Sequence, residues 1–405
     1  MSTPICIFED EACTNLNPLT PTRPVYDLRC GITSLKEKIL RHFPGSPIHL
    51  QCRDYLADAV REKNPGIAVN EIEGDRCLFI NGRVLADADF GEKIDLKWEG
   101  TYLSGETVVA TVLAGEALAG VCSRLGDPLL KELLHIGQTR SIEVKLIGYP
   151  WHLIQENGSQ IKADFEYRNR GGQILGRVYP NVTLLGKEHI CIGKDAKIKP
   201  GVVLDAEEGP IYISENVTVY PNAVIEGPAF VGKDSLIKIG AKIYEGTSIG
   251  EVCKVGGEVE ESILHAYSNK QHEGFLGHAY VGEWCNFGAD TNNSDLKNNY
   301  RNVKVQINHE LVDTGSLFVG LFMGDHTKTG INTMFNTGTV VGVGCNVYGA
   351  GVPLRFIPSF TWGGAEIIAK CDLEKTLDTA RRAMARRKMI LTLAQEKVLR
   401  KLYEM

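Results

Sequence analysis

The chain has 405 residues, of which 43% are hydrophobic, and its formal net charge is −6. A chain of this length can bury a large core and is expected to hold two or three domains. The negative charge gives no sign of nucleic acid or an anionic membrane as a partner, and eleven cysteines without a CxxC pair indicate reduced thiols rather than disulfides or zinc.

The first 172 residues contain strand-like and helix-like segments but no repeat. Ile5–Phe8 and Cys77–Ile80 are short apolar runs and are predicted to be strands. Ser34–Phe43 is predicted to be a helix with Ser34 as its N-cap. Residues 167–172 (YRNRGG) suit a linker, so residues 1–172 form the first predicted domain.

Two segments bear on where the protein is located. The first twelve residues, MSTPICIFEDEA, carry acidic residues where a secretory signal needs basic ones. The most apolar run, Val108–Val121, contains Glu116 and is too short to span a bilayer. We therefore expect a cytoplasmic protein that makes no contact with a membrane.

Aliphatic residues recur at every sixth position in the middle of the chain. They are Ile213, Val219, Ile225, Val231, Ile237, Ile243, Ile249 and Val255. The residue four positions after each is mostly small, from Val217 and Ala223 to Cys253. A period of six fits neither an α-helix nor an alternating strand, and is typical of a hexapeptide β-helix with three hexads in each triangular coil. Residues 178–364 are therefore predicted to form an all-β parallel β-helix, in which the repeat resumes at Val319.

The last segment, residues 365–405, changes to helical periodicity. Its apolar stripe consists of Leu373, Leu377, Ala380, Met384 and Leu391. Its other face carries Arg381, Arg382, Arg386, Arg387 and Lys388. We expect a C-terminal α-helix that caps the β-helix or packs on a neighbour, with its basic face either solvated or in contact with an acidic ligand or a neighbouring subunit.

The hexad is interrupted between Val259 and Val319 by polar sequence rich in asparagine. Departures from regular coils usually become loops that carry function, although asparagine also suits turns. The segment includes His272 and His278 as well as three lysines, Lys270, Lys297 and Lys304. This combination of imidazole, amide and ammonium groups suits a polar, phosphate-bearing ligand.

Residues 272–282 (HEGFLGHAYVG), Asn286-Phe-Gly-Ala and Asn299-Tyr300 resemble the acetyltransferase domain of the bifunctional glucosamine-1-phosphate N-acetyltransferase/UDP-N-acetylglucosamine pyrophosphorylase family. The resemblance implies a left-handed β-helix, a homotrimer, and acetyl-CoA as the acyl donor. It makes His272 the general base and places Asn286, Asn299 and Tyr300 at the sugar. Lys304 or Lys270 would then lie near the sugar phosphate.

Two positions depart from that family's pattern. Phe275 stands where the family has a tyrosine, so a hydroxyl group is missing. A family lysine upstream of the histidine has no counterpart, because the corresponding stretch is Val259-Glu-Glu-Ser262.

Residues 17–31 (NPLTPTRPVYDLRCG), Tyr149-Pro-Trp151 through Ala163-Asp-Phe165, and residues 323–332 (MGDHTKTGIN) resemble a divergent branch in which a sugar nucleotidyltransferase is joined to this acyltransferase. By this resemblance the first domain is α/β and nucleotidyltransferase-like. Arg23, Arg29 and Lys38 are its candidate nucleotide-binding residues.

The first domain also departs from the nucleotidyltransferase pattern. Residues 11–20 (EACTNLNPLT) lack the two glycines of the phosphate-binding loop, and Arg83 stands where a metal-binding aspartate is expected. Two alternatives remain, an altered but active uridylyltransferase that uses UTP and Mg²⁺, and a degenerate nucleotide fold used for assembly. With Arg83 in place of the aspartate, we predict weak or absent activity.

Acyl transfer needs a base that accepts a proton while an amine attacks a thioester. A histidine with a pKa near ~6.5 can do so at neutral pH, and backbone N–H groups can bind the oxyanion, so no metal is needed. His272 is the first candidate. His326 is the second, because Asp325 precedes it and would orient its ring, or it binds the acyl donor.

The predicted function is acyl-CoA-dependent N-acetylation of an amino-sugar phosphate such as glucosamine-1-phosphate, coupled to uridylyl transfer if the first domain is active. One alternative is a non-catalytic β-helix scaffold or sugar-nucleotide sensor. The polar interruption favours the enzyme, because a scaffold would keep regular coils. A weaker alternative is a γ-type carbonic anhydrase, which would need histidines spaced around a subunit interface for zinc.

Overall fold

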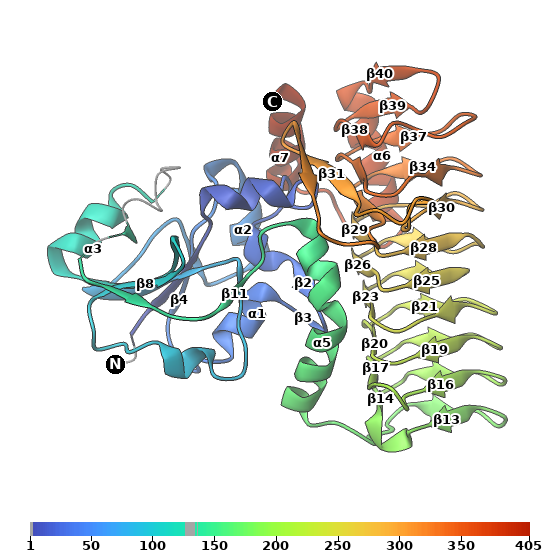
Figure 1. The fold of residues 1–405 in the computed structure, drawn as a ribbon, viewed down its shortest axis with the longest axis horizontal. Helices are drawn as coiled ribbons and strands as arrows, with labels where there is room; N and C mark the ends of the chain where they lie inside the picture. The colour runs from blue at the N-terminus through green and yellow to red at the C-terminus, as the bar shows by residue number, and fades with distance from the viewer. Residues whose placement is uncertain (1–2, 126–133, 136) are drawn as a thin grey trace.

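The computed structural model describes residues 3–125, 134–135 and 137–405. Figure 1 shows an N-terminal α/β part, a tall stack of β-helix coils beside it, and two C-terminal helices near one end of the stack. The predicted fold class, an α/β domain followed by a parallel β-helix, is confirmed. None of the described helices combines the length and the apolar composition that crossing a bilayer requires.

A seven-stranded sheet of order β10-β8-β9-β6-β1-β4-β5 forms the centre of the N-terminal part. Its strands are β1 Ile5–Phe8, β4 Ile48–Leu50, β5 Ala68–Val69, β6 Arg76–Asn81, β8 Gly100–Ser104, β9 Thr107–Ala114 and β10 Thr139–Ser141. The predicted strands at residues 5–8 and 77–80 are therefore confirmed. β1 pairs in parallel with β4 and β6, so that Phe8 lies opposite Asn81. Two short ladders add β2 Arg29–Cys30 with β3 Thr33–Ser34, and β7 Val84–Leu85 with β11 Lys145–Leu146.

The α-helices described in this part are α1 Leu35–Leu40, α2 Ala57–Lys63, α3 Gly115–Cys122 and α5 Pro150–Arg168. Short 3-10 helices are η1 Glu11–Leu16, η2 Val25–Asp27, η3 Asp54–Leu56 and η4 Phe90–Lys93. Ser34 caps α1 as predicted, in a capping box with Glu37, but α1 ends before Phe43 because Pro44 and Gly45 follow. α5 extends to Arg168, into the segment expected to be a linker, and Asn169 ends it in a left-handed conformation.

The β-helix has three faces, each a parallel sheet. The first face contains β12 Arg177–Val178, β15 Lys197–Ile198, β18 Thr218–Val219, β21 Leu236–Ile237, β24 Lys254–Val255, β27 Asn269–Lys270, β34 Lys328–Thr329, β37 Asn346–Val347 and β39 Thr361–Gly363, with β40 Ile368–Lys370 antiparallel at its end. The second contains β13 Thr183–Leu185, β16 Val203–Asp205, β19 Val224–Glu226, β22 Lys242–Ile243, β25 Glu258–Glu260 and β28 Phe275–Gly277, followed by the pair β30 Asn292–Asn293 and β35 Met334–Phe335. The third contains β14 Ile190–Ile192, β17 Ile211–Ile213, β20 Ala229–Val231, β23 Thr247–Glu251, β26 Ile263–Ala266, β29 Tyr280–Glu283, β33 Leu321–Met323, β36 Thr339–Val341 and β38 Phe356–Ile357.

The hexad aliphatic residues fill the interior of these coils. Every one from Ile213 to Val255 is buried in one core cluster, together with the small residues Ala223, Ala229 and Cys253. Burying these side chains from successive coils supplies the main stabilising free energy of the stack, because each coil covers the apolar face of the one before it. The hexapeptide prediction is thus confirmed for residues 213–255. The predicted register of the resumed repeat is wrong, because Val319 lies outside this cluster, whereas Leu321 and Met323 lie within it.

The N-terminal part packs on the third face of the β-helix (Figure 1). Leu16, Leu28 and Trp151 share a buried cluster with Tyr280 and Phe322 of that face. An antiparallel hairpin, β31 Lys304–Ile307 and β32 Glu310–Asp313, leaves the coils and reaches the same domain. At its tip Asn308 Nδ2 donates to the carbonyl oxygen of Thr14 at 3.1 Å.

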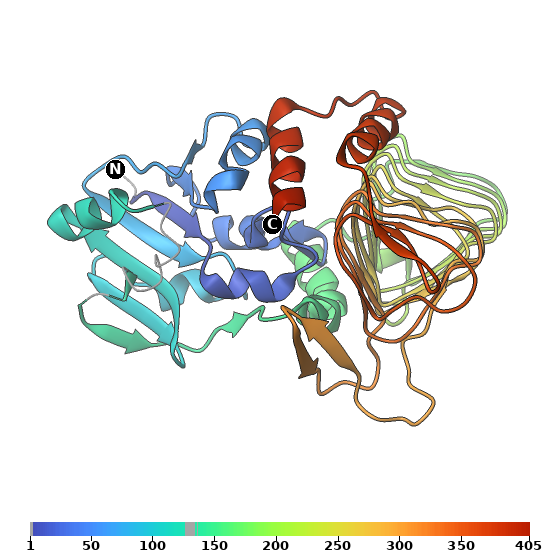
Figure 2. The ribbon, with the colours of Figure 1, turned by 90° about the horizontal axis from the view of Figure 1, so that it is seen from above.

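The C-terminal segment forms two helices, α6 Leu373–Ala385 and α7 Leu393–Glu404, where we expected one. The chain breaks between them because Lys388 adopts a left-handed conformation and Thr392 starts a new helix with a capping box to Gln395. Figure 2 shows α7 between the N-terminal part and the β-helix, with α6 against the coils. The predicted stripe packs as expected, with Leu377, Ala380 and Met384 buried against Trp284.

Candidate functional site

His272 lies in the loop between β27 and β28, at the corner that joins the first and second faces. Its side chain is exposed, and no hydrogen bond or ion pair engages its imidazole in the part of the chain that the structure describes. Its carbonyl oxygen accepts a hydrogen bond from Lys270 Nζ at 3.1 Å. The loop backbone is therefore fixed while the ring remains accessible to a substrate.

Lys270 fixes this loop from inside the coil. It stands in register with the core residue Val255, is only 2% exposed, and also donates to the carbonyl oxygen of Gly256 at 3.0 Å. Burial lowers the pKa of its ammonium group to about 8. The structure therefore corrects the predicted role of Lys270, since an inward-facing lysine holding two carbonyl oxygens does not reach a sugar phosphate outside the coil.

Asn286 extends the first face by bridging Asn269 and Lys328. The Asn269 amide donates to Asn286 Oδ1 at 3.3 Å, and Arg387 Nη2 donates to Asn269 Oδ1 at 2.7 Å. The C-terminal basic segment thus reaches the asparagine pair. Asn269 is three residues from His272, which an extended chain spans in at most about 10 Å.

Arg387 belongs to a group of cations on the first face, which we call the first-face cations and define as Lys238, Lys254, Arg386 and Arg387. Lys254 lies in register with Asn269. Desolvation, the two arginines and Lys238 all lower the pKa of Lys254, so these charges lie close enough to repel one another. Such a group is suited to an anionic ligand. Arg381 and Arg382 of the same predicted basic face instead form ion pairs with glutamate and aspartate of the C-terminal helices.

Asn299, Tyr300 and Lys304 lie elsewhere, on the insertion that leaves the corner between the second and third faces. All three are exposed, Tyr300 by 71%. Within one chain they are not gathered around His272. The insertion displaces them because residues 294–318 leave the coil before β33 resumes it.

His278 forms an ion triad with two carboxylates. Its Nδ1 lies 2.9 Å from Asp295 Oδ2 and its Nε2 lies 3.3 Å from Glu261 Oε2, while its ring stacks on Phe318. Burial disfavours the charged ring, but the hydrogen bonds to Asp295 and Glu261 outweigh it and raise the pKa to about 9. A histidine that is already protonated at neutral pH cannot serve as a base there.

The ionised His278 is expected to make stability depend on pH. Its pKa rises from 6.5 to about 9 on folding, so its contribution is complete below pH 6.5 and is lost as pH rises through 9. The contribution is on the order of 3 kcal/mol. Urea midpoints of the wild type and His278→Gln should therefore converge between about pH 6 and 10, and a difference that does not change with pH would contradict the triad.

His326 lies at the corner between the third and first faces. Its Nδ1 is buried and has no hydrogen-bond partner among the described residues. Desolvation and the nearby Lys328 lower its pKa to about 3. The orienting contact predicted from Asp325 is absent, because that carboxylate accepts from Thr22 Oγ1 and the Glu283 amide and pairs with Arg23. A base this weak is a poor proton acceptor at neutral pH, so His272 remains the stronger candidate.

The three predicted nucleotide-binding cations are all engaged with protein carboxylates. Arg23 pairs with Asp325, Arg29 with Glu251 at 2.7 Å, and Lys38 with Asp164 at 2.6 Å. Asp325 and Glu251 belong to the β-helix, so the first two pairs join the two parts of the chain. The structure therefore corrects the prediction that these cations converge on a nucleotide.

Residues at the C-terminal ends of β1 and β6 also pair with one another and not with a ligand. Arg83 holds both carboxylate oxygens of Asp10, at 2.7 and 2.6 Å, and Asn81 Nδ2 donates to the same carboxylate. η1 replaces the glycine-rich loop expected after β1. Because Asp10 is neutralised by a guanidinium, these residues do not fit the Mg²⁺ that nucleotidyl transfer implies. No cluster of three potential metal ligands occurs among the described residues.

Residues 5–173 match a family model described as sugar nucleotidyl transferase. The chain is 30% identical over 209 residues to a bifunctional sugar-1-phosphate nucleotidylyltransferase/acetyltransferase of Sulfurisphaera tokodaii, covering 52% of this chain and 46% of that protein. It is 32% identical over 184 residues to the bifunctional protein GlmU of Nocardia farcinica, covering 42% and 34%. The chain thus spans about half or less of the curated relatives it matches.

Among the solved structures that overlap the chain at low similarity is a single-substitution mutant of perosamine N-acetyltransferase from Caulobacter crescentus, in complex with CoA and GDP-perosamine. It is 15% identical to the chain, with a TM-score of 0.17. The overlap covers 67% of this chain and 96% of that one, and at this TM-score it supports no further statement.

Proposed function

We propose that this chain, whose residues 5–173 match the sugar nucleotidyl transferase family model, is an acyl-CoA-dependent N-acetyltransferase that acts on an amino-sugar phosphate such as glucosamine-1-phosphate. The observation that carries the proposal is the exposed His272 on a loop fixed by Lys270, next to the asparagine pair and the first-face cations. The printed name of the Sulfurisphaera tokodaii relative, a nucleotidylyltransferase/acetyltransferase, supports the same activity.

The proposed reaction forms an N–C bond between the sugar amine and the acetyl carbonyl carbon, and breaks the C–S bond to CoA. His272 accepts the amine proton, and the departing thiolate takes up a proton to leave as free CoA. Backbone N–H groups of the loop stabilise the oxyanion. The first-face cations lie beside Asn269 and are placed to attract the phosphate groups of the donor or the sugar.

Assembly and location form part of the proposal. A homotrimer with closed threefold symmetry would let a neighbouring chain supply Asn299, Tyr300 and Lys304, which stand apart from His272 in a single chain. The eleven free cysteines, most of them buried, support a reducing compartment such as the cytoplasm. Light scattering that showed a monomer at micromolar concentration would overturn the trimer.

Measuring the free thiol of CoA released from acetyl-CoA distinguishes an acyltransferase from a non-catalytic scaffold. With acetyl-CoA and glucosamine-1-phosphate together, thiol release should be catalytic, and either compound alone should release none. Acetyl-CoA should also raise the melting temperature by mass action. Ligand-induced stabilisation without thiol release would favour the alternative, a sugar-nucleotide-binding scaffold.

Uridylyl transfer by the first domain is predicted to be weak or absent. Arg83 neutralises Asp10, and the candidate phosphate-binding cations are held by other carboxylates. The domain is proposed to serve assembly through these ion pairs. Pyrophosphate release from UTP and N-acetylglucosamine-1-phosphate with Mg²⁺ should stay near background, with the Sulfurisphaera tokodaii relative as the positive control. Robust magnesium-dependent release would contradict the prediction.

A further inference from the structure

One corner of the β-helix, between the third and first faces, has a single left-handed residue in each coil. Along the stack these residues are Asp195, Asn216, Asp234, Val252, Tyr267, Trp284, His326, Gly344 and Phe360. Aspartate, asparagine and glycine adopt this conformation at little cost. The later coils instead place a β-branched residue and large rings there, which is uncommon and costs stability.

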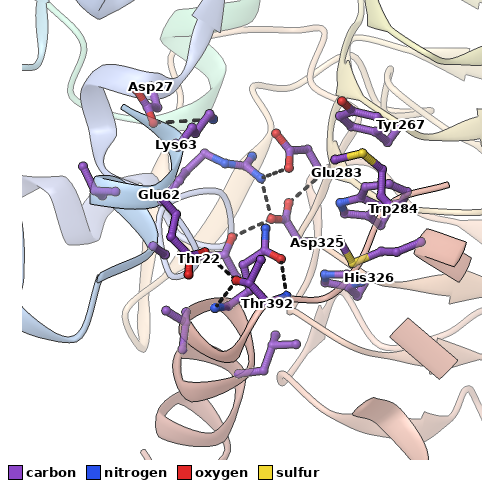
Figure 3. Close-up of a pocket in the computed structure, with 18 of the residues that line it drawn as sticks. Thr22, Asp27, Glu62, Lys63, Tyr267, Glu283, Trp284, Asp325, His326 and Thr392 are labelled. Atoms are coloured by element: carbon purple, nitrogen blue, oxygen red, sulfur yellow. Dashed lines mark hydrogen bonds and ion pairs between the residues drawn. The ribbon is translucent and has the colours of Figure 1, made fainter. Parts of the chain in front are cut away.

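Three of these rings form a column. Tyr267 and Trp284 stack with centroids 4.4 Å apart, and Trp284 and His326 are nearly parallel at 6.4 Å. Figure 3 shows the three side chains one after another along a single wall of a pocket. Backbone strain maintained at three successive coils suggests that this wall has a use beyond closing the core.

The pocket lies where all three parts of the chain meet, and its volume is about 340 Å³. The β-helix supplies the ring column, the N-terminal domain supplies Arg23 and Lys63, and the C-terminal helical segment supplies Met384 and Met389. One side is thus apolar and flat, and the other is polar. A cavity of this size fits a ligand built around one or two rings.

Two of the residues that line the pocket each carry a buried nitrogen atom without a partner among the described residues. The two atoms are Arg23 Nη1, on a side chain only 5% exposed, and His326 Nδ1. A buried polar atom without a partner lowers stability, because it has lost its hydrogen bonds to water. Since native structures rarely leave such groups unpaired, these two atoms indicate that a polar ligand completes the site.

The charges around the pocket narrow the class of ligand. Four carboxylates line it, from Asp27, Glu62, Glu283 and Asp325, against the cations Arg23 and Lys63. Asp325 pairs with Arg23, Glu283 lies 3.6 Å from the same guanidinium, and Asp27 lies 3.5 Å from Lys63. The excess of negative charge disfavours a polyphosphate inside the pocket, whereas carboxylates accept hydrogen bonds from hydroxyl and amine groups.

We propose that this junction pocket binds a nucleoside. Its base lies against Trp284 and His326, with an acceptor atom toward Arg23 Nη1, and its hydroxyl groups face Glu283 and Asp325. The site is separate from His272, which lies at the next corner of the coil, so this inference does not rest on the proposed acyl transfer.

The test is isothermal titration of the full chain with the four ribonucleosides and with their 5′-triphosphates. At least one nucleoside should bind, and its triphosphate should bind at least about tenfold more weakly. Excess acetyl-CoA should not compete with it. Binding of no nucleoside, or tighter binding of the triphosphate, would overturn the proposal. Displacement by acetyl-CoA would also overturn it, by assigning the pocket to the acyl donor.

Two variants test the lining. His326→Asn removes the imidazole but keeps a residue that tolerates the left-handed corner, and should weaken nucleoside binding by about tenfold or more. Met389→Ser, at a side chain 42% exposed and therefore unimportant for folding, should weaken it several-fold. Val252→Asn, at the same corner but outside the pocket lining, is the matched control and should bind like the wild type. Unchanged binding in both lining variants would refute the site.

Discussion

Replacement of His272 by alanine is expected to lower the kcat of acetyl transfer by about 10²–10⁴-fold, the usual contribution of a general base. The KM for the sugar phosphate should change much less, because the imidazole acts mainly in the transition state. Since His272 is exposed and its loop is held through its carbonyl oxygen, the melting temperature should stay within about 1 °C of the wild type. Initial rates of thiol release over a range of substrate concentrations measure both constants.

The matched control is His189→Ala, at another exposed histidine near the opposite end of the β-helix, in η5 Lys187–His189. Its acetyl transfer should equal that of the wild type. If His272→Ala is nearly silent while His326→Ala abolishes transfer, the base has been assigned to the wrong histidine. If neither substitution lowers the rate, the acyltransferase proposal gives way to the scaffold.

The β-helix could be predicted because its stabilising pattern is local in sequence. Residues such as Ile213 and Val219 repeat at a fixed spacing, and each coil needs only its neighbours to bury them. The same logic fails where the spacing is broken. Lys270 occupies an inward position in register with Val255. Because the hexad is interrupted there, the sequence does not reveal this register, and a lysine is then expected at the surface.

The partners of the first domain's cations could not be predicted, for a different reason. Arg23 and Asp325 are 302 residues apart, and Arg29 and Glu251 are 222 apart. No sequence pattern links partners at such separations. The sequence therefore could not show that each arginine is paired with a carboxylate and is not available to a phosphate. The departures from the nucleotidyltransferase pattern at residues 11–20 and at Arg83 are visible in the sequence, however. The bidentate pair of Arg83 with Asp10 explains the second of them, because the arginine neutralises the carboxylate.

The junction pocket had no detectable sequence signal. It needs residues from three parts of the chain, and its ring column is contiguous only after coiling brings Tyr267, Trp284 and His326 to one corner. For the C-terminal basic face, contact with an acidic ligand or a neighbouring subunit stays a prediction. The structure adds a contact that the sequence did not predict, from Arg387 Nη2 to Asn269 Oδ1 within the same chain.

Asp164 of α5 shows how strongly one such long-range carboxylate can hold the first domain. One oxygen accepts from Lys38 Nζ at 2.6 Å and from Arg41, and the other accepts from the backbone amides of Ile32 and Thr33. Lys38 has no exposed surface, so the lysine needs this partner to remain charged. Desolvation already lowers the pKa of Lys38 despite the carboxylate.

Asp164→Ala should therefore destabilise the protein by on the order of 3–5 kcal/mol, because it leaves a buried cation uncompensated. A lower midpoint in urea, followed by circular dichroism, measures the effect. Asp378→Ala, which removes an exposed pair with Arg382 within α6, is the matched control and should cost at most about 0.5 kcal/mol. Adding Lys38→Met to Asp164→Ala should recover much of the loss, since the charge itself is then gone. If Asp164→Ala unfolds like the wild type, Lys38 does not depend on this carboxylate, and its assignment as a nucleotide-binding residue would have to be reopened.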